Sequence, residues 1–531
     1  MRSTTRRRRR RPPPPSRNRS IPTRRRGPPS TAVKTRRLDH GRCGYDDRVA
    51  DSAGSGNFAR EALNGDNRFV TGIALVAAIG GLLFGFDTGV ISGAQLFIGK
   101  DLHSSTGAQA WFVGSLLLGA VGGAVFAGYL ADLISRRWTK FCAGLIYVGA
   151  ALWSALATST GSLIAARAVL GLAVGTASFV APLYISEHVP PRLRGGTVSF
   201  NQFMITFGIL LAYIIDYLFK DVANNWRWML GLGALPGIAL VIAMALVPHT
   251  PRWLLQKGRE DEARAVLMKT RDDEKAVDEE IQDVKDVVSE ERSVKTRDLI
   301  TPKLRPMLLV GLGLAFFQQF VGVNTVIYYS PTILKSAGFT ADQSITQALS
   351  VGITNVVFTV VAILLLDRIG RRKLLLVGTV GLTGALVLLG IFFQSATLQA
   401  DAAWIAVVAL VIFIASFAIG LGPVFWLMIA EIFPLRIRSH AMSVCTVVNW
   451  GANFLISYYF LDLVGKIGRP STFWLYAGFG VLATTFFLLK VPETKGRSLE
   501  QIERDLGADT DAGGTSGRKR KGSARSQSQA A

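Results

Sequence analysis

The chain has 531 residues, of which 50% are hydrophobic and 18% are charged, and its mean hydropathy is +0.34. Soluble chains carry about 25% charged residues, so this composition favours a protein that lies in lipid and argues against a soluble enzyme. The net charge of +22 is typical of nucleic-acid-binding proteins, but residues 1–60 alone supply a surplus of 14 positive charges. Cys43, Cys142 and Cys445 are too scattered for a metal site or a disulfide framework.

Residues 1–66 form an arm rich in Arg and Pro and poor in apolar residues, so we expect it to be disordered. It lacks the short apolar run of a secretory signal. Three interpretations remain: a cytoplasmic arm lying on anionic lipid headgroups, a translated leader upstream of the true start, or a nucleic-acid-binding arm. Aromatic residues for base stacking do not alternate with the arginines, so we expect membrane lipid and not nucleic acid as the partner.

Twelve apolar runs are long enough to cross a bilayer, which takes roughly 20 residues each, and six lie on either side of a polar stretch. This pattern predicts an all-α membrane protein with two six-helix halves. The predicted spans are 69–91, 111–134, 139–158, 162–185, 197–219, 227–247, 307–330, 344–367, 373–393, 403–430, 441–464 and 471–490.

The polar stretch at 249–305 carries 13 basic and 14 acidic residues, and Val277, Ile281, Val284 and Val288 recur at helical spacing. We therefore expect a helical loop there, between a first half at 67–248 and a second half at 306–491. Residues 492–531 form a polar tail. The Lys and Arg residues concentrate in alternate short loops, which the positive-inside rule places in the cytoplasm together with the 249–305 loop and both termini.

Two sequence signatures recur at matching positions in the halves. Glu187, Arg192 and Arg194 follow the fourth span in the same spacing as Glu431, Arg436 and Arg438 after the tenth. Asp132, Arg136 and Arg137 likewise match Asp367, Arg371 and Arg372. Parallel repeats of six spans with a site between them are typical of a transporter that works by a rocking motion.

Seven segments then identify a family. They are GGLLFGFDTGVISGA (80–94), ARAVLGLAVG (166–175), PLYISEHVPPRLRG (182–195), FFQQFVGVNTVIYYSP (316–331), DRIGRR (367–372), GPVFWLMIAEIFP (422–434) and VPETKGRSLEQIE (491–503). In this order the chain resembles the sugar porter family of the major facilitator superfamily from about Gly80 to Glu503. The resemblance implies a twelve-helix transporter in the plasma membrane that works without a cofactor and catalyses no covalent chemistry.

The chain departs from the family pattern at three places. The loop after the second span should resemble Asp-Arg-x-Gly-Arg-Arg but has Leu133 and Ser135 in place of the first Arg and the Gly. The Pro-Glu-Ser-Pro-Arg motif appears with His249 and Thr250 at its second and third positions. Ile209 stands where several proton-coupled members have a glutamine, which leaves the substrate open.

Asp87 and Arg167 are the charged residues well inside the predicted spans, where each costs about 2.5–3.5 kcal/mol on insertion scales. Helix directions place both in the outer half of the membrane. One interpretation is a structural ion pair between the first and fourth spans. The other, which the resemblance favours, is a protonation site at Asp87 with Arg167 as its partner.

The remaining polar residues within the spans are neutral amides, accompanied by indoles. Amide groups match the vicinal hydroxyls of a sugar, whereas single amides are also explained by hydrogen bonds between helices. The number and spread of these residues favours a cavity for a small neutral sugar or polyol, and the resemblance implies sugar contacts for most of them. The predicted substrate-binding residues are Phe84, Gln202, Gln318, Gln319, Asn324, Asn355, Trp426, Asn449 and Trp450.

The charged residues at the cytoplasmic helix ends would contribute little as surface pairs, but the resemblance implies a salt-bridge latch that closes this side. Its members are Asp132, Arg136, Arg137, Glu187, Arg194, Asp367, Arg371, Arg372, Glu431 and Arg438. Asp216 and Asp462 lie near outer helix ends, where we expect them to face water, and we assign no role to His188 or His249.

We therefore predict a proton-coupled symporter for a hexose, a pentose or a cyclic polyol. A facilitative sugar uniporter is the main alternative, and the acidic Asp87 argues against it. A sugar sensor would need a foldable domain in the tails, and a drug exporter would need a larger apolar cavity with fewer amides.

Overall fold

The structure is a computed structural model that describes residues 68–497 except 190, 270, 272, 292–298, 300, 303 and 435–436, together with 501–502 and 505–506. The predicted arm at 1–66 and the end of the tail lie outside this part. The first half and the polar loop contain α3 (Arg68–Asp101), α4 (Thr106–Ile134), α5 (Arg136–Leu156), α6 (Thr160–His188), α7 (Pro191–Phe219), α8 (Asn225–Leu232), α9 (Ala234–Leu246), α10 (Pro251–Gln256), α11 (Glu260–Leu267) and α12 (Glu274–Glu291).

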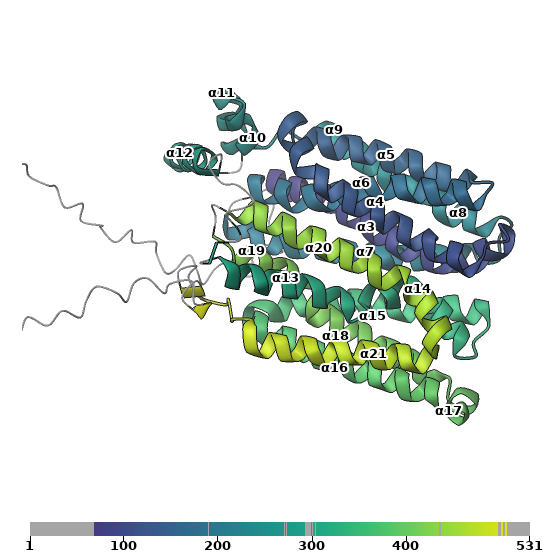
Figure 1. Cartoon of the computed structure of the whole chain (residues 1–531). Coiled ribbons are helices and arrows are strands. Elements are labelled where there is room, and N and C mark those ends of the chain that lie inside the picture. The colour runs from purple at the N-terminus through teal and green to yellow at the C-terminus, as the bar shows by residue number, and fades with distance from the viewer. Residues whose placement is uncertain are drawn as a thin grey trace, which may run out of the picture. The chain divides into compact units, whose positions relative to one another are not determined.

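The second half contains α13 (Arg305–Phe320), α14 (Val323–Ser336), α15 (Ala341–Ile369), α16 (Arg371–Gln394), α17 (Ala396–Asp401), α18 (Trp404–Ile419), α19 (Leu421–Glu431), α20 (Arg438–Tyr458) and α21 (Phe460–Lys490). Figure 1 shows the long helices running side by side, so that the chain crosses the same layer repeatedly. We call the residues before Pro251 the N half and those from Arg305 to Lys490 the C half.

The helices confirm a twelve-span membrane fold in two halves of six. Among the residues that the structure describes, eleven spans are long and apolar enough to cross a bilayer. The twelfth is the 21-residue helix α20, whose polar residues lower its hydropathy. Three spans are broken in the middle, at Gly233, between α13 and α14, and at Gly420. The eleventh span ends at Tyr458, six residues before the predicted end at 464. The part of α21 that follows the kink at Gly468 agrees with the predicted span 471–490.

Close helix packing in the N half depends on small residues. A Cβ on Gly171 would lie 2.0 Å from the carbonyl oxygen of Leu116, and one on Gly175 would lie 2.1 Å from that of Ala120. The backbones of α4 and α6 therefore approach within a distance that only glycine permits. Membrane helices gain most of their association energy from such packing, since lipid supplies little hydrophobic drive.

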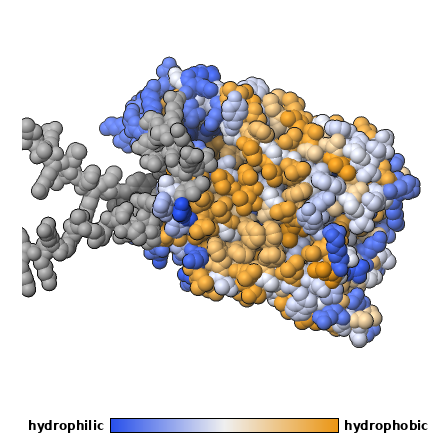
Figure 2. Space-filling model, viewed as in Figure 1, coloured by the Kyte–Doolittle hydropathy of each residue, from blue (hydrophilic) through white to orange (hydrophobic). Residues whose placement is uncertain are grey.

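The outer surface has the polarity of a membrane protein. Figure 2 shows a broad hydrophobic band between hydrophilic ends. Large apolar side chains point outward from several spans, and Leu156, Leu246 and Leu489 are each more than 70% exposed. A soluble protein rarely exposes an apolar surface of this extent, so this band is the surface that contacts lipid.

The polar loop folds into three short helices at one end of the bundle (Figure 1). Val277 and Ile281 on α12 are buried against Leu255 and Leu267, as the helical spacing predicts. The indole nitrogen of Trp253 on α10 donates to the carbonyl of Asp132, 3.1 Å away, at the end of α4. We call this end of the bundle the loop end and the opposite one the far end.

Candidate functional site

Asp87 on α3 and Arg167 on α6 form a buried ion pair. Nη1 of Arg167 lies 2.8 Å from Oδ1 of Asp87, and the two side chains are 1% and 4% exposed. Nε of Arg167 also donates to the carbonyl of Phe112 on α4, 2.9 Å away. The guanidinium thus joins three helices of the N half, while Oδ2 of Asp87 is buried with no hydrogen-bond partner in the described part of the chain.

A cavity of about 60 Å³ lies beside this pair, between the two halves. Its volume is sufficient for a few water molecules. All nine side chains predicted to bind substrate line it: Phe84, Gln202, Gln318, Gln319, Asn324, Asn355, Trp426, Asn449 and Trp450. Phe84 and Thr88 connect this cavity to the ion pair, because they lie on the same turn of α3 as Asp87.

The amides of the C half form a connected hydrogen-bond network. Nδ2 of Asn449 donates to Oε1 of Gln318 at 2.6 Å, and Nε2 of Gln319 donates to Oδ1 of Asn449 at 3.2 Å. Nδ2 of Asn324 in turn donates to Oε1 of Gln319 at 2.8 Å. The groups that could bind sugar hydroxyls are therefore held in place by one another, which fixes their orientation before a ligand enters.

Two buried polar atoms at the cavity have no partner in the described part of the chain. They are Oδ1 of Asn355, an acceptor, and Nε1 of Trp450, a donor. Both residues line the cavity and are at most 2% exposed. A buried polar atom without a partner costs about 1–3 kcal/mol, so these two atoms favour a ligand that offers both a donor and an acceptor.

Sequence reasoning missed three polar residues of the cavity. Thr88, Thr206 and Asn453 also line it. Each lies close in the sequence to a residue that was predicted for the site. Thr88 follows Asp87, Thr206 lies one helical turn after Gln202, and Asn453 lies one helical turn after Asn449. The helical repeat of four residues could have found two of them.

Two further charged residues are buried in the N half, contrary to expectation. Asp216 was expected to face water, yet it is 1% exposed and its Oδ2 accepts the backbone N–H of Gly93 at 3.1 Å. The close approach of α3 and α7 at Gly93 encloses the carboxylate. Lys140, at the start of the predicted span 139–158, is fully buried in the first turns of α5. Asp462 is exposed beside Lys466, as expected.

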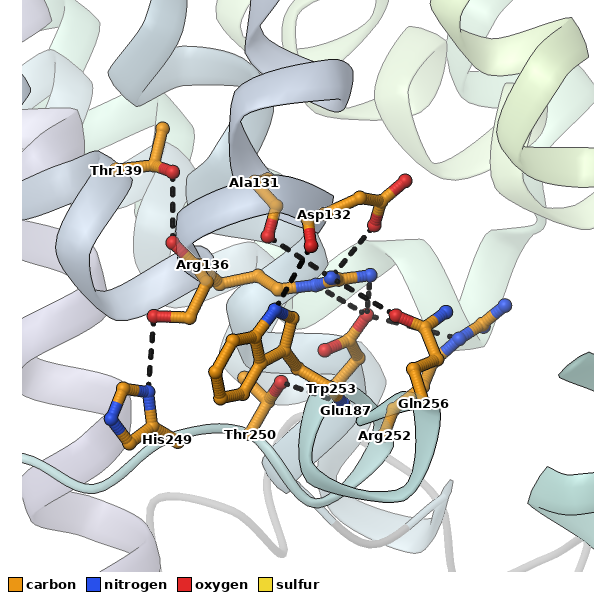
Figure 3. Close-up of polar contacts among 11 residues, drawn as sticks. Ala131, Asp132, Arg136, Thr139, Glu187, His249, Thr250, Arg252, Trp253 and Gln256 are labelled. Atoms are coloured by element: carbon orange, nitrogen blue, oxygen red, sulfur yellow. Dashed lines mark hydrogen bonds and ion pairs between the residues drawn. The ribbon is translucent and has the colours of Figure 1, made fainter. Parts of the chain in front are cut away.

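The predicted latch residues gather at the loop end in two separate clusters. In the N half, Arg136 contacts Glu187 at 3.1 Å and Asp132 at 2.8 Å (Figure 3). Glu187 is only 3% exposed and Arg136 4%, so this is a buried pair and not the surface pair considered above. Loss of one partner of a buried pair destabilises a protein by about 3–5 kcal/mol.

In the C half, Arg371 contacts Glu431 at 3.3 Å. The outer arginines of each cluster bind backbone carbonyls: Arg137 binds those of Met244 and Ala245, and Arg372 that of Leu488. Arg438 likewise donates to the carbonyl of Phe433. Arg194 lies in α7 and Asp367 in α15, but their side chains lie outside the described part.

The two halves meet through polar and aromatic contacts at the far end. Nε2 of Gln95 on α3 donates to the carbonyl of Tyr328 on α14 at 2.7 Å. The hydroxyl of Tyr213 on α7 donates to the carbonyl of Ile327 at 2.9 Å. Trp111 on α4 packs against Tyr458 on α20 with ring centres 4.8 Å apart. These contacts close the far end over the cavity.

Twelve spans in two related halves, with a polar cavity between them, define a membrane transporter of the major facilitator type. The comparisons agree with this class. Residues 73–506 match the family described as "Sugar (and other) transporter". The chain therefore belongs to this sugar transporter family.

Several relatives are similar over most of their length. The chain is 41% identical to a D-xylose transporter of Levilactobacillus brevis, over 82% of this chain and 95% of the relative. It is 38% identical to the arabinose–proton symporter of Escherichia coli K12, over 82% and 93%. Among solved structures, the inward open conformation of the xylose transporter XylE from E. coli is similar, with a TM-score of 0.71 and 30% identity over 82% of this chain and 99% of that one.

Proposed function

We propose that the protein is a proton-coupled symporter for a small neutral sugar or polyol and that it works by alternating access. The cavity carries this proposal, because uncharged amides and indoles line it and its lining residue Thr88 is adjacent in sequence to Asp87 of the buried carboxylate–guanidinium pair. None of the described residues that line the cavity is charged, which favours a neutral substrate. Relatives named as xylose, arabinose and galactose transporters or symporters support a sugar.

In this proposal, Asp87 takes up the proton and Arg167 is its partner. Protonation of Asp87 would end its attraction to the guanidinium, which could then rely on the carbonyl of Phe112. Phe84 and Thr88 line the cavity and lie on the same turn of α3 as Asp87. A rearrangement of the Asp87–Arg167 pair would therefore move side chains that contact the sugar. The amide network would give up some of its internal hydrogen bonds and form hydrogen bonds with sugar hydroxyls instead. Its members are Gln318, Gln319, Asn324 and Asn449.

The proposed conformation is closed at the far end. The cavity is too small for a sugar ring without rearrangement, so sugar must enter by movement of the halves. In the opposite state, the contacts of Gln95 and Tyr213 with α14 would break. The latch clusters at the loop end, including Glu187 and Glu431, would then approach the other half.

We infer that the loop end faces the cytoplasm, with both termini on that side of the plasma membrane. Basic residues concentrate in its short connections, in agreement with the positive-inside rule. Cysteines introduced at Lys285 on α12 and at Lys466 near the far end should react with impermeant thiol reagents from opposite faces. Reaction of Lys285→Cys from outside intact cells would overturn this orientation.

Uptake of a panel of labelled sugars by proteoliposomes tests the proposed function. Neutral hexoses, pentoses and cyclic polyols should be tried with and without an imposed proton gradient. We expect at least one of them to accumulate only when the gradient is present. If a sugar only equilibrates across the membrane, whether or not a proton gradient is imposed, the protein is a facilitative uniporter. If no neutral sugar is taken up, the proposed substrate class is wrong.

A further inference from the structure

Each half has the same sharp corner before its arginine pair. Ser135 precedes Arg136 with φ 90° and ψ 155°, and Gly370 precedes Arg371 with φ 100° and ψ 157°. Glycine adopts such a backbone at little cost, whereas a residue with a side chain is strained there by about 1–3 kcal/mol. Ser135 therefore needs a compensating interaction that Gly370 does not.

The corner of the C half is capped by a carboxylate. Oε1 of Glu493 accepts the N–H of Arg371 at 2.9 Å, and Oε2 accepts that of Arg372 at 3.2 Å. A negative charge at the start of α16 is favourable because the helix dipole is positive there. A Cβ on Gly370 would lie 2.6 Å from Oε2 of Glu493, so this glutamate requires glycine at the corner.

The N half has other residues at the positions that correspond to Gly370 and Glu493. The segment Val-Pro-His-Thr at 247–250 corresponds to Val-Pro-Glu-Thr at 491–494, so His249 occupies the position of Glu493. Nδ1 of His249 lies 3.0 Å from Oγ of Ser135, and the same Oγ accepts the N–H of Trp138 at 3.3 Å. The two residues that depart from the repeat therefore contact each other.

His249 also attaches the loop helices to the membrane bundle. Its ring stacks on Trp253 with centres 4.9 Å apart and planes at 21°. Trp253 donates to the carbonyl of Asp132, and Gln256 of the same helix α10 contacts Arg136 at 3.4 Å (Figure 3). A change at His249 would therefore affect Asp132 through Trp253 and Arg136 through Gln256.

The surroundings of His249 oppose a positive charge. Burial, followed by the nearby cations Arg137 on α5 and Arg259 at the start of α11, lowers the pKa of His249, and Glu262 opposes this shift. His188 at the end of α6 is the other titratable group that faces it. The start of α5 adds the positive end of a helix dipole.

We propose that Ser135 and His249 form a proton-binding site in the N-half latch, in place of the permanent carboxylate cap of the C half. While Nδ1 is unprotonated, the Ser135 hydroxyl donates to it and accepts from Trp138. A proton on Nδ1 removes this acceptor and places a cation beside Arg137 and Arg259. The contact of α10 with the latch then weakens, whereas the Glu493 cap is unchanged at the same pH.

The sign of the pH effect follows from the lowered pKa. The unfolded chain binds a proton at His249 more readily than the folded protein does, with a pKa of about 6.5. Stability from this site is therefore complete above about pH 6.5 and is lost as the pH falls below it. Its effect on transport rests on the proposed function, but the proton site itself does not.

Thermal unfolding of the full-length protein in detergent tests the site without any transport assay. Between about pH 7.5 and about pH 5.5, the Tm of His249→Gln should fall by about 1–2 °C less than that of the wild type. The double variant Ser135→Gly with His249→Glu, which restores the pair of the C half, should show the same flattened profile. His103→Gln, at the far end, is the matched control and should keep the wild-type fall.

The single variant His249→Glu supplies a second test. Because a Cβ at the corner crowds the carboxylate, it should be less stable than the double variant at about pH 7.5, so the two substitutions should not be additive. Identical pH profiles for wild type and His249→Gln would overturn the proton site. A difference between the Tm profiles of wild type and His249→Gln would support the proton site. If acidification of the loop side then fails to slow sugar exchange by the wild type, the site binds a proton without regulating transport.

Discussion

The two halves of the bundle share a plan of six spans but bury different side chains. In the described part of the chain, the buried Asp, Lys and Arg residues of the spans all belong to the N half: Asp87, Arg136, Lys140, Arg167 and Asp216. The C half buries amides and hydroxyls, such as Gln318, Gln319 and Asn449. Under the proposed function, the N half would bind the proton, while the C half would supply most of the sugar contacts beside Phe84 and Gln202 of the N half. Mutations should then separate the two roles.

The largest expected effect is removal of the charge partner in the N half. Arg167→Ala would leave Asp87 buried without a cation, which costs about 3–5 kcal/mol. We expect a clear loss of thermal stability and no measurable transport. The double variant Asp87→Asn with Arg167→Gln should recover part of the stability. Equal instability of the single and double variants would contradict the account of a compensated ion pair.

A smaller and different effect is expected in the C half. Gln319→Ala removes one member of the amide network, and unmatched polar groups cost about 1–3 kcal/mol. Sugar affinity should fall roughly tenfold or more while the pH dependence of transport stays as in the wild type. Gln282→Ala, on exposed α12, is a control that should change neither. An unchanged sugar affinity in Gln319→Ala would show that Gln319 only forms hydrogen bonds between helices and does not bind sugar.

The contact between the halves should give a third, more modest effect. Pro331 lacks the N–H that would bind the carbonyl of Ile327 within α14, and the Tyr213 hydroxyl binds that carbonyl instead. Tyr213→Phe should therefore open the far end more often. A cysteine at Ile209 in the cavity should then react several-fold faster with a thiol reagent supplied from the far face.

Tyr329→Phe is the matched control for the far end. Its hydroxyl donates to the carbonyl of Ser457 at 3.3 Å, which lies within the C half. Tyr329→Phe removes a buried hydroxyl on α14, the helix that Tyr213 contacts, but leaves the contact between the halves intact, so labelling should not change. Equal acceleration in both variants would show that Tyr213 acts through general loosening and not through the contact between halves.

Much of this arrangement could be predicted from the sequence, because membrane spans and helix-end signatures are local patterns. Apolar length predicted the spans, and the amides and indoles within the spans, together with the family resemblance, predicted the nine cavity residues. The burial of Asp216 and Lys140 could not be predicted, since it depends on how closely neighbouring helices approach. At Gly93 a Cβ would lie 2.4 Å from the Asp216 carboxylate, and only the packed structure shows this distance.

The latch illustrates the same limit. Comparison with the family pattern showed Ser135 and His249 as departures from two separate motifs. Their contact joins residues 114 positions apart in the chain, so spacing gave no sign that they form one site. The pairing of Arg136 with Glu187 was expected at the surface, but the packing of α10 buries it.

The central claim is that Asp87 carries the coupling proton while the amides of the C half bind sugar. Asp87→Asn keeps the shape of the side chain and removes its titration, so sugar exchange across proteoliposome membranes should continue. Accumulation of sugar against its gradient should be lost, and exchange should become nearly independent of the pH at the far face, whereas wild-type uptake rises as that pH falls. Uphill accumulation by Asp87→Asn with the wild-type pH dependence would contradict the account and would leave Asp87 and Arg167 as a structural pair.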